Sequence, residues 1–196
     1  MSGIFKRLNS LLSRRKGGSA MNNTELDNLI TTSLTTFAAD LLDSGWCGKE
    51  HDWVNRYAFN YLLKLCSPTS IFREPGQLGI EVQVGQPPGY YSKPAACRDI
   101  VLWPQSGMSC WGEDWQPIFH PLAILEWKVH RPRRRNREQP HEREWLRHYT
   151  DWQKAPVAYA VEVDLGCSPS TLTCCRYHAG TEQAGWLRFK GRGRRG

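Results

Sequence analysis

The sequence lacks the marks of a disulfide-rich, membrane-spanning or nucleotide-hydrolysing protein. Its seven cysteines are odd in number and irregularly spaced, which predicts free thiols in a reducing, cytoplasmic compartment. No apolar run approaches the roughly 20 residues of a membrane span, and Lys6, Arg7 and Arg14 interrupt the apolar residues near the N-terminus, unlike a secretory signal. Neither G-x-x-x-x-G-K-[ST] nor G-x-S-x-G occurs, so phosphate-loop hydrolase and esterase functions have no local support.

The composition is that of one globular domain with basic ends. The chain has 196 residues, 40% hydrophobic and 23% charged, enough to bury a full core. Eight of its 26 Lys and Arg residues, and none of its 19 acids, lie in residues 1–20 and 191–196. We therefore expect two basic tails around a near-neutral domain at 21–190, and the net charge of +7 is a weak argument for what the domain binds.

The hydrophobic periodicity predicts an α/β domain in the order α-α-β-β-β-α-β-β, with a central mixed β-sheet flanked by helices. Apolar residues at helical spacing predict the helices, and short alternating or continuous apolar runs predict the strands. The expected helices are 24–43, 49–65 and 142–153, and the expected strands are 79–84, 98–103, 123–129, 157–165 and 171–177, with a last short one at 185–190.

Three charged residues lie in two of the expected strands. Asp99 begins the run Asp-Ile-Val-Leu-Trp, and Glu126 and Lys128 lie inside Ala-Ile-Leu-Glu-Trp-Lys-Val. Burying such charges is unfavourable unless they are paired or bind a metal. Strand alternation places Glu126 and Lys128 on one face, and Asp99 approaches them if the two strands pair. The alternative is structural: Glu126 and Lys128 form a charge pair on an edge strand, and Asp99 caps a turn.

This pattern resembles the PD-(D/E)xK, or restriction-endonuclease-like, nuclease superfamily. Its motif is an acid on one strand and then (D/E)-x-K on the next, which here are Asp99 and Glu126-Trp127-Lys128. The resemblance covers roughly residues 48–165 and includes the helix, the three-stranded meander and the helix that follow one another there. The chain departs from the pattern at Arg98, where the family often has Pro.

The resemblance implies roles for particular residues. Asp99, Glu126 and the main-chain carbonyl of Trp127 would bind Mg²⁺ or Mn²⁺, whose preferred ligands are oxygens. Lys128 would be catalytic, and Glu50, on the helix before the meander, would complete the catalytic set. Glu81, on the strand before Asp99, is the alternative candidate for this role. The structural alternative for Glu50 is a solvated acid in the first turn of a helix, where the helix dipole favours a negative charge.

An arginine-rich loop directly follows the Glu126/Lys128 strand. We expect its arginines to contact nucleic-acid phosphates, although such charge runs are usually solvated loops. Trp127, Trp111 and Trp115 are candidates for stacking on bases. The arginines are Arg131, Arg133, Arg134, Arg135 and Arg137.

The sequence therefore predicts a metal-dependent nuclease that hydrolyses phosphodiester bonds in nucleic acid, with DNA the expected substrate and partner. The first alternative is a non-catalytic nucleic-acid-binding protein of the same fold. The second is a protein-interaction module, which the near-neutral domain favours. The sequence leaves the oligomeric state open and is compatible with a homodimer.

Overall fold

The structure is a computed structural model, and it describes residues 19–90, 93–131, 140–153 and 156–193. Residues 1–18 of the expected N-terminal tail and residues 194–196 of the expected C-terminal tail lie outside this part of the chain. So do four of the five loop arginines, namely Arg133, Arg134, Arg135 and Arg137. Among the helices of the described residues, none is long and apolar enough to cross a membrane.

The fold is built on one six-stranded sheet whose strands follow one another in space as they do in the chain. Every neighbouring pair is antiparallel except β3 and β4, which are parallel. A parallel pair needs a crossover connection, and helix α4 lies in the segment that supplies it. The strands are β1 (Leu78–Gly85), β2 (Ala95–Leu102), β3 (Ala123–His130), β4 (Val157–Asp164), β5 (Thr171–His178) and β6 (Thr181–Lys190).

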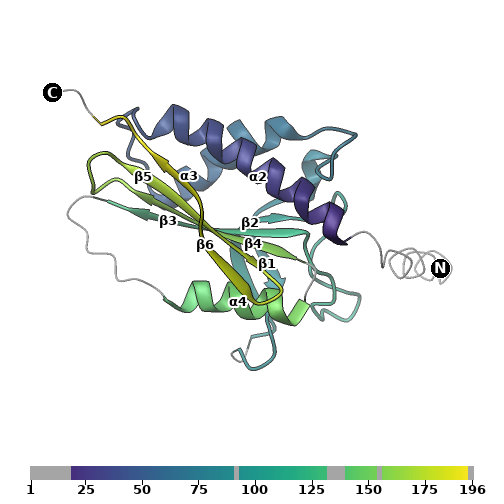
Figure 1. Cartoon of the computed structure of the whole chain (residues 1–196). Helices are drawn as coiled ribbons and strands as arrows, with labels where there is room; N and C mark the ends of the chain where they lie inside the picture. The colour runs from purple at the N-terminus through teal and green to yellow at the C-terminus, as the bar shows by residue number, and fades with distance from the viewer. Residues whose placement is uncertain (1–18, 91–92, 132–139, 154–155, 194–196) are drawn as a thin grey trace.

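Helices cover both faces of the sheet (Figure 1). Helices α2 (Ser19–Leu41) and α3 (Glu50–Tyr57) lie on one face, and α4 (Pro140–Gln153) lies on the other. The chain of α3 continues as a π-helical turn (Ala58–Leu62) and a 3-10 turn (Leu63–Leu65), and another 3-10 turn (Pro75–Gln77) precedes β1. Because both faces are covered, the central strands β3 and β4 are almost continuously buried.

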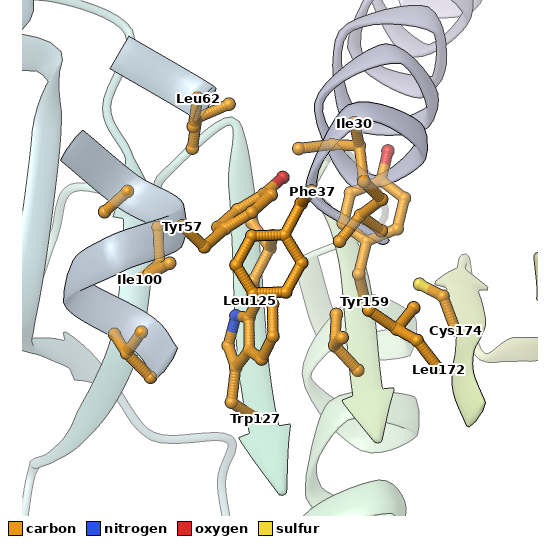
Figure 2. Packing of buried hydrophobic residues seen from close by; sticks show 14 of the residues in the cluster. Ile30, Phe37, Tyr57, Leu62, Ile100, Leu125, Trp127, Tyr159, Leu172 and Cys174 are labelled. Carbon is orange, nitrogen blue, oxygen red and sulfur yellow. The ribbon is translucent and has the colours of Figure 1, made fainter. Parts of the chain in front are cut away.

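Each face of the sheet has its own hydrophobic core. We call the cluster under α2 and α3 the upper core. Its centre is Phe37, whose ring makes edge-on contacts at 5.4 Å with those of Tyr57 and Trp127 (Figure 2). A third edge-on contact joins it to Trp53 at 5.6 Å. Such edge-to-face aromatic pairs add to the free energy gained by burial. The cluster under α4, which includes Val101, Trp103, Trp145 and Tyr149, is the lower core.

The described architecture confirms the expected α/β class and the order of the elements. Three elements differ from the expected ones in where they begin or in how far they stay regular. The first helix begins at Ser19, the second changes to π and 3-10 geometry after Tyr57, and the last strand begins at Thr181. Strand β6 is mostly exposed, and its hydrophobic pattern is correspondingly weak, which explains why periodicity alone predicts only part of it.

Candidate active site

Strands β2 and β3 pair over only part of their length. Their register joins Ile100–Leu102 to Ala123–Leu125, whereas β3 pairs with β4 along its whole length, from Ala123 to His130. The second half of β3, which carries Glu126 and Lys128, therefore lies beyond its paired segment with β2. Such a split exposes backbone groups at the middle of a sheet and creates space for side chains between the two strands.

Strand β1, on the other side of β2, changes face at the level of this split. Ile80 packs against the upper core, but Val82, two residues later, packs against the lower core. Residues two apart in a regular strand point the same way. Glu81 breaks the alternation because its φ is 52°, a left-handed conformation that is uncommon outside glycine.

Strand β2 changes face at the matching position. Ile100 lies in the upper core, whereas the guanidinium of Arg98 lies over the Trp145 ring in the lower core, 3.6 Å from its centroid. Asp99 is the residue between them. It therefore lies where β2 turns away from β3.

Where β2 no longer pairs with β3, two acidic side chains accept hydrogen bonds from the backbone amides of β3. The Trp127 amide donates a hydrogen bond to Asp99 Oδ2 at 2.7 Å, and the Val129 amide donates to Glu50 Oε2 at 3.2 Å. Glu50 is the first residue of α3, so the helix delivers its carboxylate to the edge of the strand. Backbone amides left unpaired in a protein interior are unfavourable, and these carboxylates satisfy them.

Glu126 forms a buried ion pair with Arg98. Arg98 Nη1 lies 2.9 Å from Glu126 Oε1, and the two side chains are only 10% and 8% exposed. The Trp145 ring supports the guanidinium from below through a cation–π contact. The carboxylate on β3 is thus held in place by a side chain from β2 that is itself positioned by α4.

Lys128 lies between two further carboxylates. Its Nζ is 3.1 Å from Glu50 Oε1 and 3.1 Å from Glu142 Oε2. Glu50 begins α3 and Glu142 is in the first turn of α4, so this one ammonium group joins helices from opposite faces of the sheet. All three side chains are partly exposed, at 25–38%, and the network therefore opens to solvent.

The carboxyl pKa values at this site are raised. Burial raises the pKa of Glu126 to about 8, outweighing the opposing effect of Arg98, and the nearby Asp99 raises it further. Burial also raises the pKa of Asp99, although the Trp127 amide, Lys128 and a side-chain hydrogen bond with Glu126 all oppose the shift. The two carboxyl groups are thus neighbours in a poorly solvated place that favours a proton or another cation.

The pKa of Lys128 is raised as well. Burial acts to lower it, but the charges of Glu142 and Glu50 outweigh that effect. Lys128 is therefore held as an ammonium ion, and its chemistry at neutral pH is that of a fixed positive charge and hydrogen-bond donor.

The structure brings Asp99, Glu126, Lys128 and Glu50 together from β2, β3 and α3. The Asp99 and Glu126 strands do pair, as this convergence requires, through Ile100–Leu102 and Ala123–Leu125. Glu81 is exposed and lies on β1, whereas the carboxylate partners of Lys128 among the described residues are Glu50 and Glu142.

One expectation for nucleic-acid contact is overturned, and the contact expected of Arg131 stays a prediction. Stacking of Trp127 on a base is wrong, because its indole is fully buried in the upper core; only its main-chain groups face the site. Arg131 donates from Nη2 to the Gly48 carbonyl at 2.7 Å, which ties the start of the arginine-rich loop to the residues before α3. Trp115 is 75% exposed, and its ring centroid lies 6.3 Å from that of Trp111.

Sequence reasoning misses Arg98 and Glu142 as site residues. The sequence distinguishes Arg98 only as a departure from the family motif, and Glu142 only as the start of a helix. An arginine directly before the strand-borne acid is one available signal, because a buried carboxylate needs a counter-ion. For Glu142 no spacing in the sequence relates it to Lys128.

The described side chains at the site offer few ligands for a metal ion. Among residues 19–90, 93–131, 140–153 and 156–193, no group of three or more His, Cys, Asp or Glu side chains is placed to hold a metal ion. Asp99 and Glu126 form a neighbouring pair, while Glu50 is bound to Lys128 and to the Val129 amide.

Comparisons with known proteins identify no relative of this chain. No family model, no curated protein and no solved structure matches it.

Proposed function

We propose that the protein is a metal-dependent nuclease that hydrolyses phosphodiester bonds in nucleic acid, with DNA the first substrate to test. The observation that carries this proposal is the convergence of Asp99, Glu126, Lys128 and Glu50 at the split between β2 and β3. It agrees with the resemblance of the Asp99 and Glu126-x-Lys128 pattern to PD-(D/E)xK nucleases.

The donor chemistry fits a hard divalent cation. Asp99 and Glu126 offer oxygen ligands of the kind that Mg²⁺ and Mn²⁺ prefer, and their raised pKa values indicate that a positive charge there would be stabilising. The Trp127 main-chain carbonyl is a further candidate ligand. Glu50 would join them only by giving up its contact with Lys128.

The site has a surplus of acidic side chains over basic ones. Glu50, Asp99, Glu126 and Glu142 face two cationic side chains, Arg98 and Lys128. A bound Mg²⁺ would offset this surplus, lower the pKa of a coordinated water and polarise a phosphoryl oxygen.

The role of Lys128 follows from its charge. Because its ammonium is held between Glu50 and Glu142, it would attract the phosphate and stabilise the negative charge that develops on it. It would donate a hydrogen bond to the attacking water or to a phosphate oxygen, and it would not serve as the base.

A cleavage assay with isosteric variants tests the proposal. Purified protein is incubated with plasmid and linear DNA in Mg²⁺ or Mn²⁺, beside Asp99→Asn and Lys128→Met. We expect each variant to lower the rate about 100-fold or more, as when one preorganised charge or donor is removed from an active site. Matched controls are Asp114→Asn and Lys64→Met, which change exposed residues. Equal cleavage by all five proteins, or cleavage unaffected by EDTA, would contradict the proposal.

One observation favours a non-catalytic nucleic-acid-binding protein as the second candidate. Glu126 is already paired with Arg98, and Glu50 and Glu142 with Lys128, so the site is partly neutralised by side chains alone. Calorimetric titration with Mg²⁺ and Mn²⁺ separates the two functions. A nuclease of this kind binds the metal and loses binding in Asp99→Asn, whereas a binding protein shows salt-dependent DNA affinity without metal binding.

A further inference from the structure

A groove lies beside the candidate site, between α4 and the hairpin of β1 and β2. Its volume is about 500 Å³, within the range of small-molecule sites. Its floor is formed by the β2 residues 95–98, and its walls by His141 and Trp145 of α4 and by Gln83, Gln86 and Lys93. The groove is therefore large enough for a ligand and adjoins the proposed catalytic residues.

The charges lining this groove are of one sign. Lys93, Arg98 and His141 are basic or can become so, and none of the described residues that line it is acidic. This contrasts with the adjoining candidate site, where acids are in excess. A groove with such a lining complements an anion, and a phosphate is the anion that arginine and lysine recognise best.

Arg98 connects the groove to the candidate site. Its Nη1 contacts Glu126 at 2.9 Å, while its buried Nε has no hydrogen-bond partner among the described residues. A guanidinium carries five donor hydrogens, so Arg98 retains donors for an anion in the groove while it holds Glu126. A ligand bound in the groove would therefore lie directly beside the proposed scissile bond.

Two amide side chains give the groove a polar wall. Gln86 is held in place, because its Nε2 donates to the Lys93 carbonyl at 3.0 Å and its Oε1 accepts from Trp145 Nε1 at 3.4 Å. Gln83 is exposed on β1, and its amide can donate and accept hydrogen bonds as the edge of a nucleobase requires. The Trp145 face is covered by Arg98 and is closed to stacking.

We propose that this groove binds the nucleotide next to the scissile phosphate, with its phosphate near Lys93, Arg98 and His141 and its base edge near Gln83. The inference rests on the proposed function, because the cleaved bond is taken to lie at Asp99 and Glu126. It adds a subsite on the side of the β1–β2 hairpin.

Cysteine alkylation gives a direct test in the unaltered protein. Cys97 is exposed and lines the groove, whereas Cys167 is exposed in the connection between β4 and β5. Iodoacetamide labelling of each thiol is followed by peptide mass spectrometry at about pH 9, because the thiolate is the reactive form. The probes are the 5′-phosphorylated dinucleotides pdTpdT and pdApdA in EDTA, so that no cleavage occurs.

The expected result is protection of Cys97 alone. At a dinucleotide concentration ten times its dissociation constant, about a tenth of the sites stay empty, so alkylation of Cys97 should slow about tenfold while Cys167 reacts unchanged. Lys93→Ala should weaken this protection, and Lys64→Ala, which removes the same charge from an exposed residue outside the groove, should not. Equal effects on both thiols, or none on Cys97, would overturn the inference.

The two proposals can fail separately. If the protein cleaves DNA but the dinucleotides do not protect Cys97, the proposed nucleotide subsite is wrong and the proposed nuclease function stands. Protection of Cys97 in a protein that cleaves no nucleic acid would establish the nucleotide groove and remove the proposed hydrolysis.

Discussion

Glu126 is the most deeply buried ionisable group at the candidate site, and Arg98 is its partner. Both side chains are about nine-tenths buried. Removing one member of a buried ion pair is more destabilising than replacing both, because the remaining charge has no partner. The proposed metal and the Arg98 guanidinium therefore act on the same carboxylate, and the stability of the protein depends on its protonation.

We predict that wild-type stability, measured in EDTA, falls as the pH rises from about 5 to 8. A carboxyl whose pKa is about 8 when folded, against 4.5 as the ordinary value, binds more protons folded than unfolded across that interval, so deprotonation favours unfolding. Glu126→Gln should remove about 2–4 kcal/mol of this dependence, as measured by urea unfolding at several pH values.

The exposed Glu113→Gln is the control and should retain the wild-type pH dependence. If the free energy of unfolding of Glu126→Gln depends on pH as steeply as that of the wild type, a group other than Glu126 takes up the proton on folding.

Glu142 is a positioning residue for Lys128, and its substitution is predicted to change the pH dependence of the proposed cleavage. Glu142 is the leading charge that raises the pKa of Lys128, so Glu142→Gln should lower that pKa and shift the alkaline limb of the rate profile to lower pH. We also expect kcat to fall about tenfold, or ~1.4 kcal/mol.

The exposed Glu144→Gln on the same helix should leave the profile unchanged. A uniform reduction of activity at every pH in Glu142→Gln would indicate a structural effect instead.

At the level of elements, the site depends on strands β1 and β2 changing face together. Glu81 has a left-handed backbone in β1, and Asp99 occupies the corresponding turn of β2. Backbone strain of this kind persists only where the surrounding structure holds it. Here it directs Arg98 toward α4 and leaves the β3 edge to Asp99 and Glu50.

We predict that Glu81→Gly raises the free energy of unfolding by about 1 kcal/mol, because glycine adopts the left-handed conformation without the penalty of a side chain. Gln83→Gly, at an ordinary exposed position of the same strand, should lower it by about 0.5–1 kcal/mol. Urea unfolding of both variants measures the difference. Equal destabilisation by the two substitutions would show that Glu81 carries no strain.

At the level of the whole molecule, the basic charge is distributed unevenly. Residues 21–190 are near neutral, and the arginine-rich segment 131–137 is their main basic stretch. Arg131 anchors the start of this loop to Gly48, close to the first residue of α3. We therefore expect the arginines that follow Arg131 in the sequence to contact a substrate of the candidate site, and the basic residues of the tails to add only nonspecific attraction.

We predict that replacing Arg133, Arg134, Arg135 and Arg137 by Gln weakens DNA binding and its salt dependence. The slope of log affinity against log salt should decrease by about 0.7–0.9 for each phosphate that the loop no longer neutralises, as measured by fluorescence anisotropy. The matched control replaces Lys6, Arg7, Arg14 and Arg15 and removes the same charge. If the slope decreases equally in both quadruple variants, the loop has no specific role.

The sequence by itself determined the elements and the candidate acids. The periods of apolar residues predicted the order of helices and strands, because they reflect which side of each element is buried. Asp99, Glu126 and Lys128 were identifiable because charges inside apolar strands are unfavourable unless something pairs with them. Glu50 was identifiable only through the resemblance and its place on a helix.

The tertiary structure alone decided which groups meet. The Arg98–Glu126 pair joins residues 28 positions apart, and the Lys128–Glu50 pair joins residues 78 positions apart. No local spacing encodes such contacts, because they depend on where β2 separates from β3 and on how α3 and α4 cover opposite faces of the sheet. The left-handed residue Glu81 lies on the neighbouring strand at the level of the split, and its conformation has no signal in hydrophobic periodicity. The sequence thus specified the charged groups, and the packing of the sheet against its helices decided their partners and their protonation.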